Sequence, residues 1–459
     1  MITYQDLLNV TGGDLERTEF VRKVINSHES SDLYKTAKIA DDYYRSRNTT
    51  IMEYQKILTT VTGQQVVDKY SPVHRSTSNF FKIFVTQLSQ YLLGNGTTWK
   101  NESTKKKLGE DFDIRLQEAT KSAFRGAVSF LFFNMDHVEV FHVYDKQKGC
   151  FAPLYDENTG GLCAGVRYWQ IDSSKPLRAT LYEIDGYTEI LWDNKNRPNI
   201  EWVHVGKDTY IRPKTPYKLQ VATTAMTGTE IISGENYSSF PIVPLWVNSE
   251  CQSEIVGLRE KIDAYDMILN GFENDLDNAQ LYWIIKGAGG MDDADLSRFL
   301  DRLRTVKAAA PVDGQEINPV EVNIPYEARE RLLERLERQL YKDAMIMNPE
   351  SLASSAATAT QIMAAYTPQN NRADELEYCI LDCIHNLLDV AGLPSETPSF
   401  TRSMVVNAQE EVQTVTMAAT FLSSEYVTTK ILTLLGDGDK AGEVLSQVVV
   451  DNMNRFDGG

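Results

Sequence analysis

The chain has 459 residues, a formal net charge of −18 and 42% hydrophobic residues. This length exceeds one ordinary hydrophobic core and predicts roughly two to four domains. The sequence has no apolar run of about eighteen residues, so we expect no membrane span. The opening MITYQDLLNV has no basic region before an apolar one, which predicts no secretory signal and synthesis in the cytoplasm. The acidic balance argues against a surface that grips nucleic acid by neutralising phosphates.

The first half of the chain divides into a helical part and a strand-rich part. Residues 1 to about 125 are predicted to be helical, with Ser31 as an N-cap and Gly94 as a C-cap. Between about 127 and 247, short segments rich in Val, Ile, Tyr and Trp alternate with turn clusters such as DENTGG and DNKNRPN. This alternation predicts a run of antiparallel strands.

Two long helices flank a compact insert in the second half. The first is predicted from about Gln252 to Leu276, and one apolar stripe runs along it: Ile255, Leu258, Ile262, Tyr265, Ile268, Phe272 and Leu276. A helix with one apolar stripe and charge elsewhere suits packing against copies of itself. The insert contains a strand, LYWIIKG, a short helix, DDADLSRFLDRLRTVK, and a second strand, PVEVNI. The second long helix, YEARERLLERLERQLYKDAMI, places Glu327 before Arg331 and Glu334 before Arg338 at i,i+4.

A loop and further helices complete the chain. The segment MNPESLASSAATAT predicts a mobile loop, because Pro349 and small polar residues break the helical pattern. A helix that begins near Ala359 is expected to be interrupted and kinked at Pro368 and to end at Gly392. Residues 393 to 459 predict another mostly helical unit.

Several groups of His, Cys and Asp residues have the composition of metal or catalytic sites. Cys379 and Cys383 share an apolar helix face from which His385 points away, so we interpret both as buried small hydrophobes. His137 and His142 differ by an odd number of residues and would face opposite sides of a strand. These spacings predict no metal site.

The other groups also favour structural roles. Asp292, Asp293 and Asp295 could be carboxylate ligands of a nuclease metal, but they fit better as capping acids of the helix that follows. GNGTTWK lacks the glycine that a phosphate loop has before its lysine. We therefore predict no cofactor and no enzymatic activity.

Ordered blocks along nearly the whole chain resemble the portal proteins of tailed phages, in particular the siphophage type of Gram-positive hosts. NFFKIFVTQLSQYLLGNGTTW is similar to the family's stretch that ends in "YLLG", and AFRGAVSFLFF to its "G-x-A" strand entry. FAPLYDENTGGLCAGVRYW resembles its paired strands. FPIVPLWVN, followed by SEIVGLREKIDAYDMILNGFENDLDN, is the most specific block. TSNFF departs from the pair of asparagines often found there, and the C-terminal segment matches only weakly.

The resemblance implies an α+β, mainly helical portal architecture. The wing would be residues 1–250, helical over 1–125 and β-rich over 127–247. The stem would be the helices at 251–279 and 326–346, with a small α/β clip at 280–325. A tunnel loop would occupy 347–358, a kinked helix 359–392 and a helical crown 393–459. In the stem, Ile255, Leu258, Ile262, Tyr265, Ile268 and Phe272 would pack against neighbouring subunits.

The family also implies a function. About twelve subunits would form a ring at one capsid vertex of the virion, through which double-stranded DNA passes without sequence-specific binding. The tunnel-loop residues expected near DNA are Asn348, Glu350, Ser351, Leu352, Ser354 and Ser355. Terminase, head–tail connector proteins, and capsid and scaffold proteins would be partners. The alternatives are another phage structural protein, such as a minor capsid or head–tail joining component, and, third, a nuclease.

Overall fold

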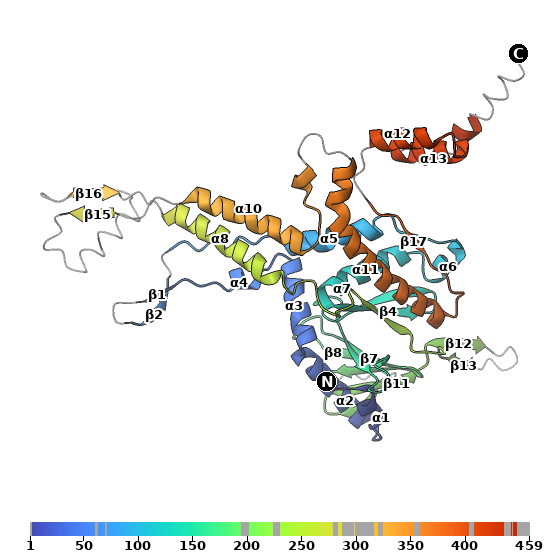
Figure 1. The fold of residues 1–459 in the computed structure, drawn as a ribbon. Coiled ribbons are helices and arrows are strands. Elements are labelled where there is room, and N and C mark those ends of the chain that lie inside the picture. Colours follow the sequence, from blue (N-terminus) through green and yellow to red (C-terminus); the bar gives the residue numbers. More distant parts are fainter. Residues whose placement is uncertain are drawn as a thin grey trace, which may run out of the picture.

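The computed structural model describes residues 2–59, 63–68, 71–193, 202–223, 230–278, 283–286, 298, 316–319, 325–352, 359–403, 408–435, 442 and 444–447. Helices and strands are mixed, and every strand pairing within these ranges is antiparallel. None of the helices in these ranges combines the length and apolar character that a bilayer span requires. Figure 1 shows a body built of sheets and helices, from which a pair of long helices projects to one side.

The largest sheet has six strands in the order β10-β11-β9-β8-β7-β6. Its strands are β6 (Cys150–Tyr155), β7 (Leu162–Trp169), β8 (Leu177–Glu183), β9 (Gly186–Trp192), β10 (Val203–Gly206) and β11 (Thr209–Thr215). Consecutive strands pair from β6 to β9, as where β8 and β9 run from Leu177 opposite Trp192 to Glu183 opposite Gly186, whereas β9 pairs with β11 and not with β10. The predicted run of antiparallel strands is confirmed.

The N-terminal helices cover this sheet. They are α1 (Tyr4–Leu8) and α2 (Asp14–Ser30), and α3 (Asp32–Tyr44), which follows α2, packs mainly against the helix at Phe112–Gly126. Phe20, Val21 and Val24 of α2 are buried in one apolar cluster with Val166 and Leu181 of the sheet. Ser31 caps α3, its hydroxyl accepting a hydrogen bond from the Tyr34 N–H, as predicted. Burial of these apolar faces ties the start of the chain to the sheet.

A second, larger core lies around a three-stranded sheet, β14-β4-β5. Its strands are β4 (Val128–Asn134), β5 (His137–His142) and β14 (Ile242–Trp246), and the helices packed around it are α5 (Phe80–Leu93), α7 (Phe112–Gly126) and α11 (Ala359–Ala391). Phe130 and Phe141 are fully buried, and both rings contact Phe151 of the larger sheet. The two sheets therefore share one continuous body.

Two long helices, α8 (Arg259–Asn278) and α10 (Tyr326–Asp343), form a projection that we call the arm. They run antiparallel side by side, and the strand pair β15 (Trp283–Lys286) and β16 (Glu316–Pro319) follows at the far end (Figure 1). The helix predicted within the insert lies outside the described residues except for Arg298, which is helical. Next to the arm, a short helix α4 (Thr49–Met52) leads to the hairpin of β1 (Ile57–Thr59) and β2 (Gln65–Val67).

The remaining elements lie around the body. A hairpin of β12 (Lys218–Thr223) and β13 (Glu230–Glu235) projects on the side away from the arm, and α12 (Ala408–Ala418) and α13 (Ser424–Leu435) lie apart from the body (Figure 1). Strand β3 (Thr97–Thr98), followed by α6 (Glu102–Lys107), pairs with β17 (Ser399–Phe400) and so joins the N-terminal third to residues after α11.

Three sequence-based predictions of element bounds need correction. Residues 1–125 are mainly helical but include β1, β2 and β3. The first long helix begins at Arg259 rather than near Gln252, because Gly257 takes a φ of 83°, a left-handed conformation that ends any helix before it. Helix α11 is continuous from Ala359 to Ala391, so the predicted interruption at Pro368 is wrong, while the kink stays a prediction. Packing of the buried side of α11 outweighs the backbone hydrogen bond that proline removes.

Candidate functional site

The residues predicted to pack between subunits lie on α8 or, for Ile255 and Leu258, just before it, and the chain itself covers half of them. Ile255, Leu258 and Ile262 are only 2%, 6% and 1% exposed within the single chain. Tyr265 packs edge-on against Phe80 of α5, with ring centroids 5.0 Å apart. Ile268 and Phe272 are half-buried, and the Arg329 guanidinium lies 5.8 Å from the centre of the Phe272 ring. The stripe therefore joins the arm to its own body and to α10.

A second side of α8 is polar and binds the irregular segment 72–79. The side-chain oxygen of Asp266 accepts from the Ser78 N–H at 3.0 Å, that of Asn270 from the Ser76 N–H at 2.7 Å, and that of Asn274 from the His74 N–H at 2.8 Å. The helix residues are four apart and the segment residues two apart. Four helical residues advance about 6 Å and two extended residues about 6.6 Å, so the spacings match.

Further side chains complete this ladder. Glu273 accepts from the Ser76 hydroxyl at 2.9 Å, and His74 Nε2 lies 2.7 Å from Asp277. Asp263 accepts from the Thr50 hydroxyl at 2.7 Å and from the Tyr43 hydroxyl. Several acids of α8 that appear as free charges in the sequence are thus structural acceptors that hold α4 and segment 72–79 against the arm.

Asp266 is the most enclosed of these acids. It is 0% exposed and also accepts a hydrogen bond from the Asn48 side chain, which is 1% exposed. Burial raises the pKa of the Asp266 carboxyl, while hydrogen bonds from Asn48 and Ser78 oppose the rise. A buried carboxylate with several donors fixes one register between helix and segment.

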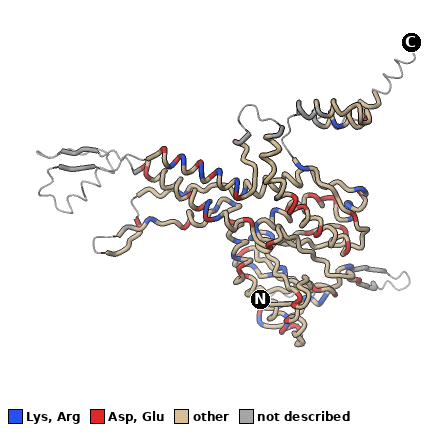
Figure 2. The backbone as a smooth tube through the Cα atoms, in the orientation of Figure 1, with Lys and Arg blue, Asp and Glu red and all other residues tan. Residues whose placement is uncertain are grey.

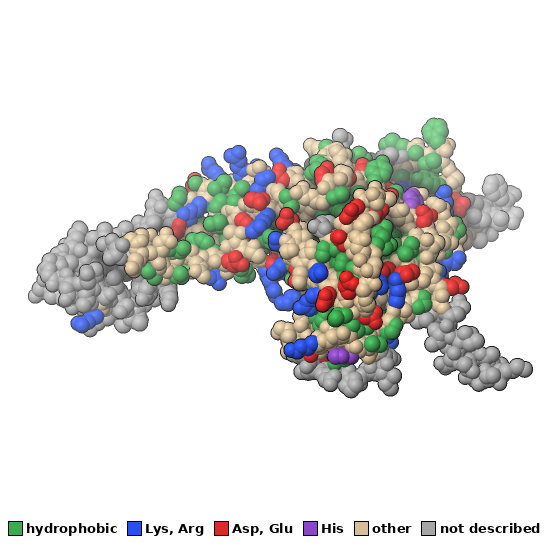
Figure 3. Space-filling model, turned by 90° about the horizontal axis from the view of Figure 1, so that it is seen from below, with side chains coloured by type: hydrophobic (Ala, Val, Ile, Leu, Met, Phe, Trp, Pro, Cys, Tyr) green, Lys and Arg blue, Asp and Glu red, His purple; other side chains and the backbone are tan. Residues whose placement is uncertain are grey.

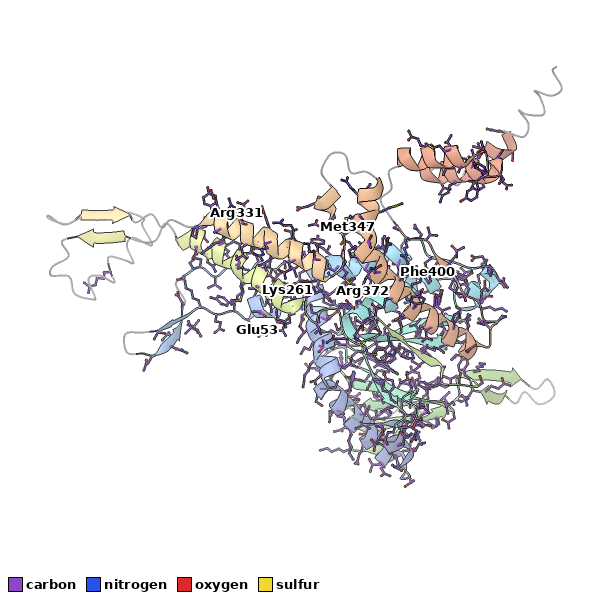
Figure 4. All side chains as sticks on the ribbon, viewed as in Figure 1. Glu53, Lys261, Arg331, Met347, Arg372 and Phe400 are labelled. Atoms are coloured by element: carbon purple, nitrogen blue, oxygen red, sulfur yellow. The ribbon has the colours of Figure 1, made fainter. Side chains whose placement is uncertain are left out.

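The two arm helices are joined by ion pairs near both ends. Arg329 binds Asp275 at 2.6 Å near the far end, and Lys261 binds Asp343 where the arm meets the body. There, too, Arg372 of α11 binds Glu254 and Glu375, and Figure 4 shows Lys261 and Arg372 in this region. The segment that leads into α8 is therefore tied to α11 through Glu254.

The predicted i,i+4 pairs of α10 are weak within the chain. Glu327 and Arg331 lie 3.9 Å apart, and both side chains are largely exposed. Arg338 donates to the backbone carbonyl of Glu334 at 3.3 Å instead of to its carboxylate. Figure 2 shows basic and acidic positions alternating along α10. The outer surface of α10 is therefore charged, and ion pairs within the chain neutralise these charges only weakly.

The predicted tunnel loop starts from an anchored turn after α10. Ile346 is buried, and the Met347 N–H donates to the side chain of the buried Gln369 of α11 at 3.1 Å (Figure 4 labels Met347). The Asn348 side chain then accepts from the Glu350 N–H at 2.9 Å, within the 3₁₀ turn η1 (Pro349–Leu352).

The turn after α10 is acidic, and the remaining residues predicted for the tunnel loop lie in it or directly after it. Glu350 is exposed, and burial together with the charges of Glu350 and Glu334 raises the pKa of Glu337. Ser351 and Leu352 belong to the turn by their backbone, and Ser354 and Ser355 lie outside the described residues. The start of the loop is thus acidic and close to α10.

The cysteine and histidine residues considered as metal ligands have structural surroundings. Cys383 is buried and Cys379 half-buried on α11, whereas His385 is half-buried and hydrogen-bonded to Thr397 at 3.1 Å. In the part of the chain that the structure describes, no group of three His, Cys, Asp or Glu residues could hold a metal ion. Asp292, Asp293 and Asp295 lie outside that part.

His137 and His142 are separated as expected. The His142 ring is buried, with Nδ1 2.7 Å from the Ser122 hydroxyl, while His137 lies at the surface beside Asp136.

The ladder residues were missed by the sequence reasoning, although a signal existed. Asp263, Asp266, Asn270, Asn274 and Asp277 recur at steps of three and four, which marks a polar stripe as clearly as the apolar one. Their partners could not be found in this way, because Ser76 and Ser78 lie nearly two hundred positions away in an irregular segment without periodicity, as the separations of 194 and 188 show.

Comparison with known proteins gives one family and several relatives. A family model described as "Phage portal protein, SPP1 Gp6-like" matches residues 23–435. The portal protein of Bacillus phage SPP1 is 23% identical over 364 residues, covering 74% of this chain and 65% of that protein. The portal protein of Clostridium phage phiCD119 is 23% identical over 201 residues, covering 42% of this chain and 45% of that protein. The chain thus spans less than two thirds of the length of both relatives.

Solved structures of gene transfer agent particles are also similar. One, the neck of an empty particle computed with C6 symmetry, has a TM-score of 0.42 and 13% identity, and the match covers 78% of this chain and 90% of that one. Another, the neck of a native particle computed with C12 symmetry, has a TM-score of 0.42 and 12% identity, and the match covers 77% of this chain and 89% of that one. The family model, by contrast, spans most of the chain and agrees with the resemblance found in the sequence. The chain belongs to the SPP1 Gp6-like family of phage portal proteins.

Proposed function

We propose that this chain is a portal subunit that assembles into a ring of about twelve copies at one vertex of a phage capsid. The match of the family model over residues 23–435 carries this proposal. Double-stranded DNA would pass through the ring during packaging and ejection. The chain would act structurally, without catalysis, at the portal vertex of the virion, after synthesis in the bacterial cytoplasm.

The described elements can be assigned to the parts of such a ring. The body at residues 1–250 would be the wing, the arm of α8 and α10 the stem, and the insert with β15 and β16 the clip. Helix α11 would lie at the base of the crown, and α12 and α13 would belong to the crown. Terminase and later the head–tail connector proteins would dock at the clip, and capsid and scaffold proteins would contact the wing.

The negative net charge of the chain supports a channel that does not bind the DNA passing through it. Twelve times −18 gives −216 for a ring of twelve copies. An acidic wall repels phosphates, so the duplex would neither adhere nor be read by sequence. Within the described residues the chain offers no metal-binding cluster for DNA cleavage. A purified preparation should therefore hydrolyse no ATP and cleave no DNA with Mg²⁺ or Mn²⁺.

The loop after α10 would touch the passing DNA. Its base is fixed by the hydrogen bond from Met347 to Gln369, and Glu350 is exposed beyond it. Asn348, Ser351, Leu352, Ser354 and Ser355 would form the rest of the contact. Removing four residues from 351–355 should leave rings intact and impair DNA packaging or retention; packaging at the wild-type level would reduce the loop to a connector.

Negative-stain imaging of the purified full chain tests the proposed function. A portal subunit should give rings with a central hole. A minor capsid or joining protein, which has no need of the arm, insert and second arm helix in this order, should give other shapes or single copies. Metal-dependent DNA cleavage by the same preparation would favour the nuclease alternative.

A further inference from the structure

Helix α10 exposes two charged stripes of opposite sign. The basic stripe consists of Arg331, Arg335, Arg338 and Lys342, and the acidic stripe of Glu327, Glu330, Glu334 and Glu337. Steps of three and four residues keep each stripe on one side of the helix. Neighbouring residues are turned by about 100°, so the centres of the two stripes lie about 90° apart around the helix. The stripes adjoin where Glu327 and Glu334 precede Arg331 and Arg338 by four residues, and Glu330 and Arg335 are about 140° apart. Basic side chains project along one edge of the arm in Figure 3.

Neither stripe is used to hold the single chain together. The side of α10 that carries Leu333, Leu336 and Leu340 faces the arm's interior, and Leu340 is 0% exposed. All stripe residues are exposed except Glu337, which is half-buried. Among the described residues, two contacts link members of the stripes: the 3.9 Å ion pair of Glu327 with Arg331, and the 3.3 Å hydrogen bond from Arg338 to the backbone carbonyl of Glu334, which leaves the Glu334 carboxylate out. Figure 4 shows Arg331 on the outer side of α10.

The stripes have the same heights along the helix. Glu330 precedes Arg331, Glu334 precedes Arg335, and Glu337 precedes Arg338, so each acid lies only about 1.5 Å along the axis from a base. Copies in a cyclic ring are related by rotation about the ring axis, without translation along it. If α10 runs along that axis, the bases of one copy stand level with the acids of the next.

We propose that, in the ring, the basic stripe of α10 in one copy contacts the acidic stripe of α10 in the next copy. This inference rests on the proposed portal function and names its subunit contact. It moves the contact away from Ile255, Leu258 and Ile262, which the chain itself buries. A contact between two different patches of one chain is the head-to-tail kind that closes a ring.

Duplex DNA fits these stripes less well than a second copy does. Helix α10 carries five basic and five acidic residues: Arg329, Arg331, Arg335, Arg338 and Lys342 against Glu327, Glu330, Glu334, Glu337 and Asp343. A helix that grips phosphates should be net basic, and here the acidic stripe would repel the backbone that the basic stripe attracts. Complementary charge between copies instead sets register and partner choice.

The test uses two charge-reversed forms of the full chain. One carries Arg331→Glu, Arg335→Glu and Arg338→Glu, and the other carries Glu327→Arg, Glu330→Arg and Glu334→Arg. Each alone would place like charges across every contact, so the concentration needed for half-assembly should rise at least about tenfold by mass photometry. An equimolar mixture should recover rings, because each form then meets its complement. A control with Lys23→Glu, Lys106→Glu and Lys107→Glu has the same change in net charge as the first form, and these exposed residues lie outside the arm.

The outcomes separate this contact from the proposed function. If each reversed form assembles like wild type, or if the mixture fails to recover rings, the stripe contact is wrong while the ring of the wild-type chain stands. If the first form assembles normally but binds a short duplex more weakly than wild type, the basic stripe serves DNA and the contact is again wrong. If the wild-type chain forms no rings, the portal function itself fails.

Discussion

Asn270 of α8 holds Ser76 by two hydrogen bonds, both 2.7 Å long: its Nδ2 donates to the Ser76 carbonyl, and its Oδ1 accepts from the Ser76 N–H. One side chain thus satisfies both backbone groups of a residue in an irregular segment. Because Asn270 is only 5% exposed, water cannot easily replace it. The pair is the centre of the ladder that fixes segment 72–79 along the arm.

Replacing Asn270 by Ala should therefore lower the free energy of unfolding by about 2–3 kcal/mol, because the Ser76 backbone groups lose their partners. Urea unfolding would measure the change. Asn371→Ala, at an exposed position of α11, is the matched control and should change stability by less than about 0.5 kcal/mol. Equal effects of the two substitutions would show that the ladder contributes nothing.

Two leucines of α10 should differ in how much they contribute to the stability of the chain. Leu340 is 0% exposed and Leu332 42% exposed. Leu340→Ala should destabilise the chain by about 2–5 kcal/mol, since it leaves a cavity between the arm and the body. Leu332→Ala should cost under about 0.5 kcal/mol in the monomer. A similar loss from both, measured by thermal unfolding, would contradict the packing described for α10.

Glu118 of α7 predicts an acid-dependent loss of stability. Although burial raises its pKa, hydrogen bonds and charge from His142 and Lys148 hold the pKa at about 2. A carboxyl whose pKa is lowered on folding contributes stability above its unfolded pKa, about 4.5, and loses it as the pH falls towards 2. Glu118→Gln should therefore flatten the fall in stability between pH 6 and pH 3 by roughly 2 kcal/mol.

The control for Glu118 is Glu110→Gln, at an exposed position. It should leave the pH profile of stability unchanged. If both variants keep the wild-type slope, the ion cluster of Glu118 has no energetic role.

Pro368 lies inside α11, which is continuous from Ala359 to Ala391. Because proline removes a helical hydrogen bond and crowds the preceding turn, Pro368→Ala should raise the free energy of unfolding by about 1–3 kcal/mol. Urea unfolding again provides the measurement. A destabilised variant would mean that the proline ring packs in a way that the helix needs.

Local rules in the sequence predicted much of this fold. The alternation of apolar residues identified the strands of the six-stranded sheet, Ser31 was identified as a cap, and both arm helices were found. The errors arose where tertiary structure overrides local preference. Gly257 shortened one helix through its positive φ, and α11 continued through Pro368.

The candidate site was predicted in part. Periodicity identified the apolar stripe of α8 but could not show whether its partner is the same chain or another copy. The structure buries Ile255 and Ile262 within the chain itself. Asn274 and His74 form a hydrogen bond although they are 200 positions apart in the sequence. Because His74 lies in an irregular segment, no periodic pattern around it identifies it as the partner of Asn274. The role of the tunnel-loop residues stays a prediction.

Mass photometry of the wild-type full chain, over a range of protein and salt concentrations, tests the central claim most directly. A portal subunit should give a dominant species of about twelve to thirteen copies, because heterologous contacts that close a ring define one size. The species should persist upon dilution far better than a chance association of exposed helices. Only monomers and dimers at every concentration and salt would contradict the account.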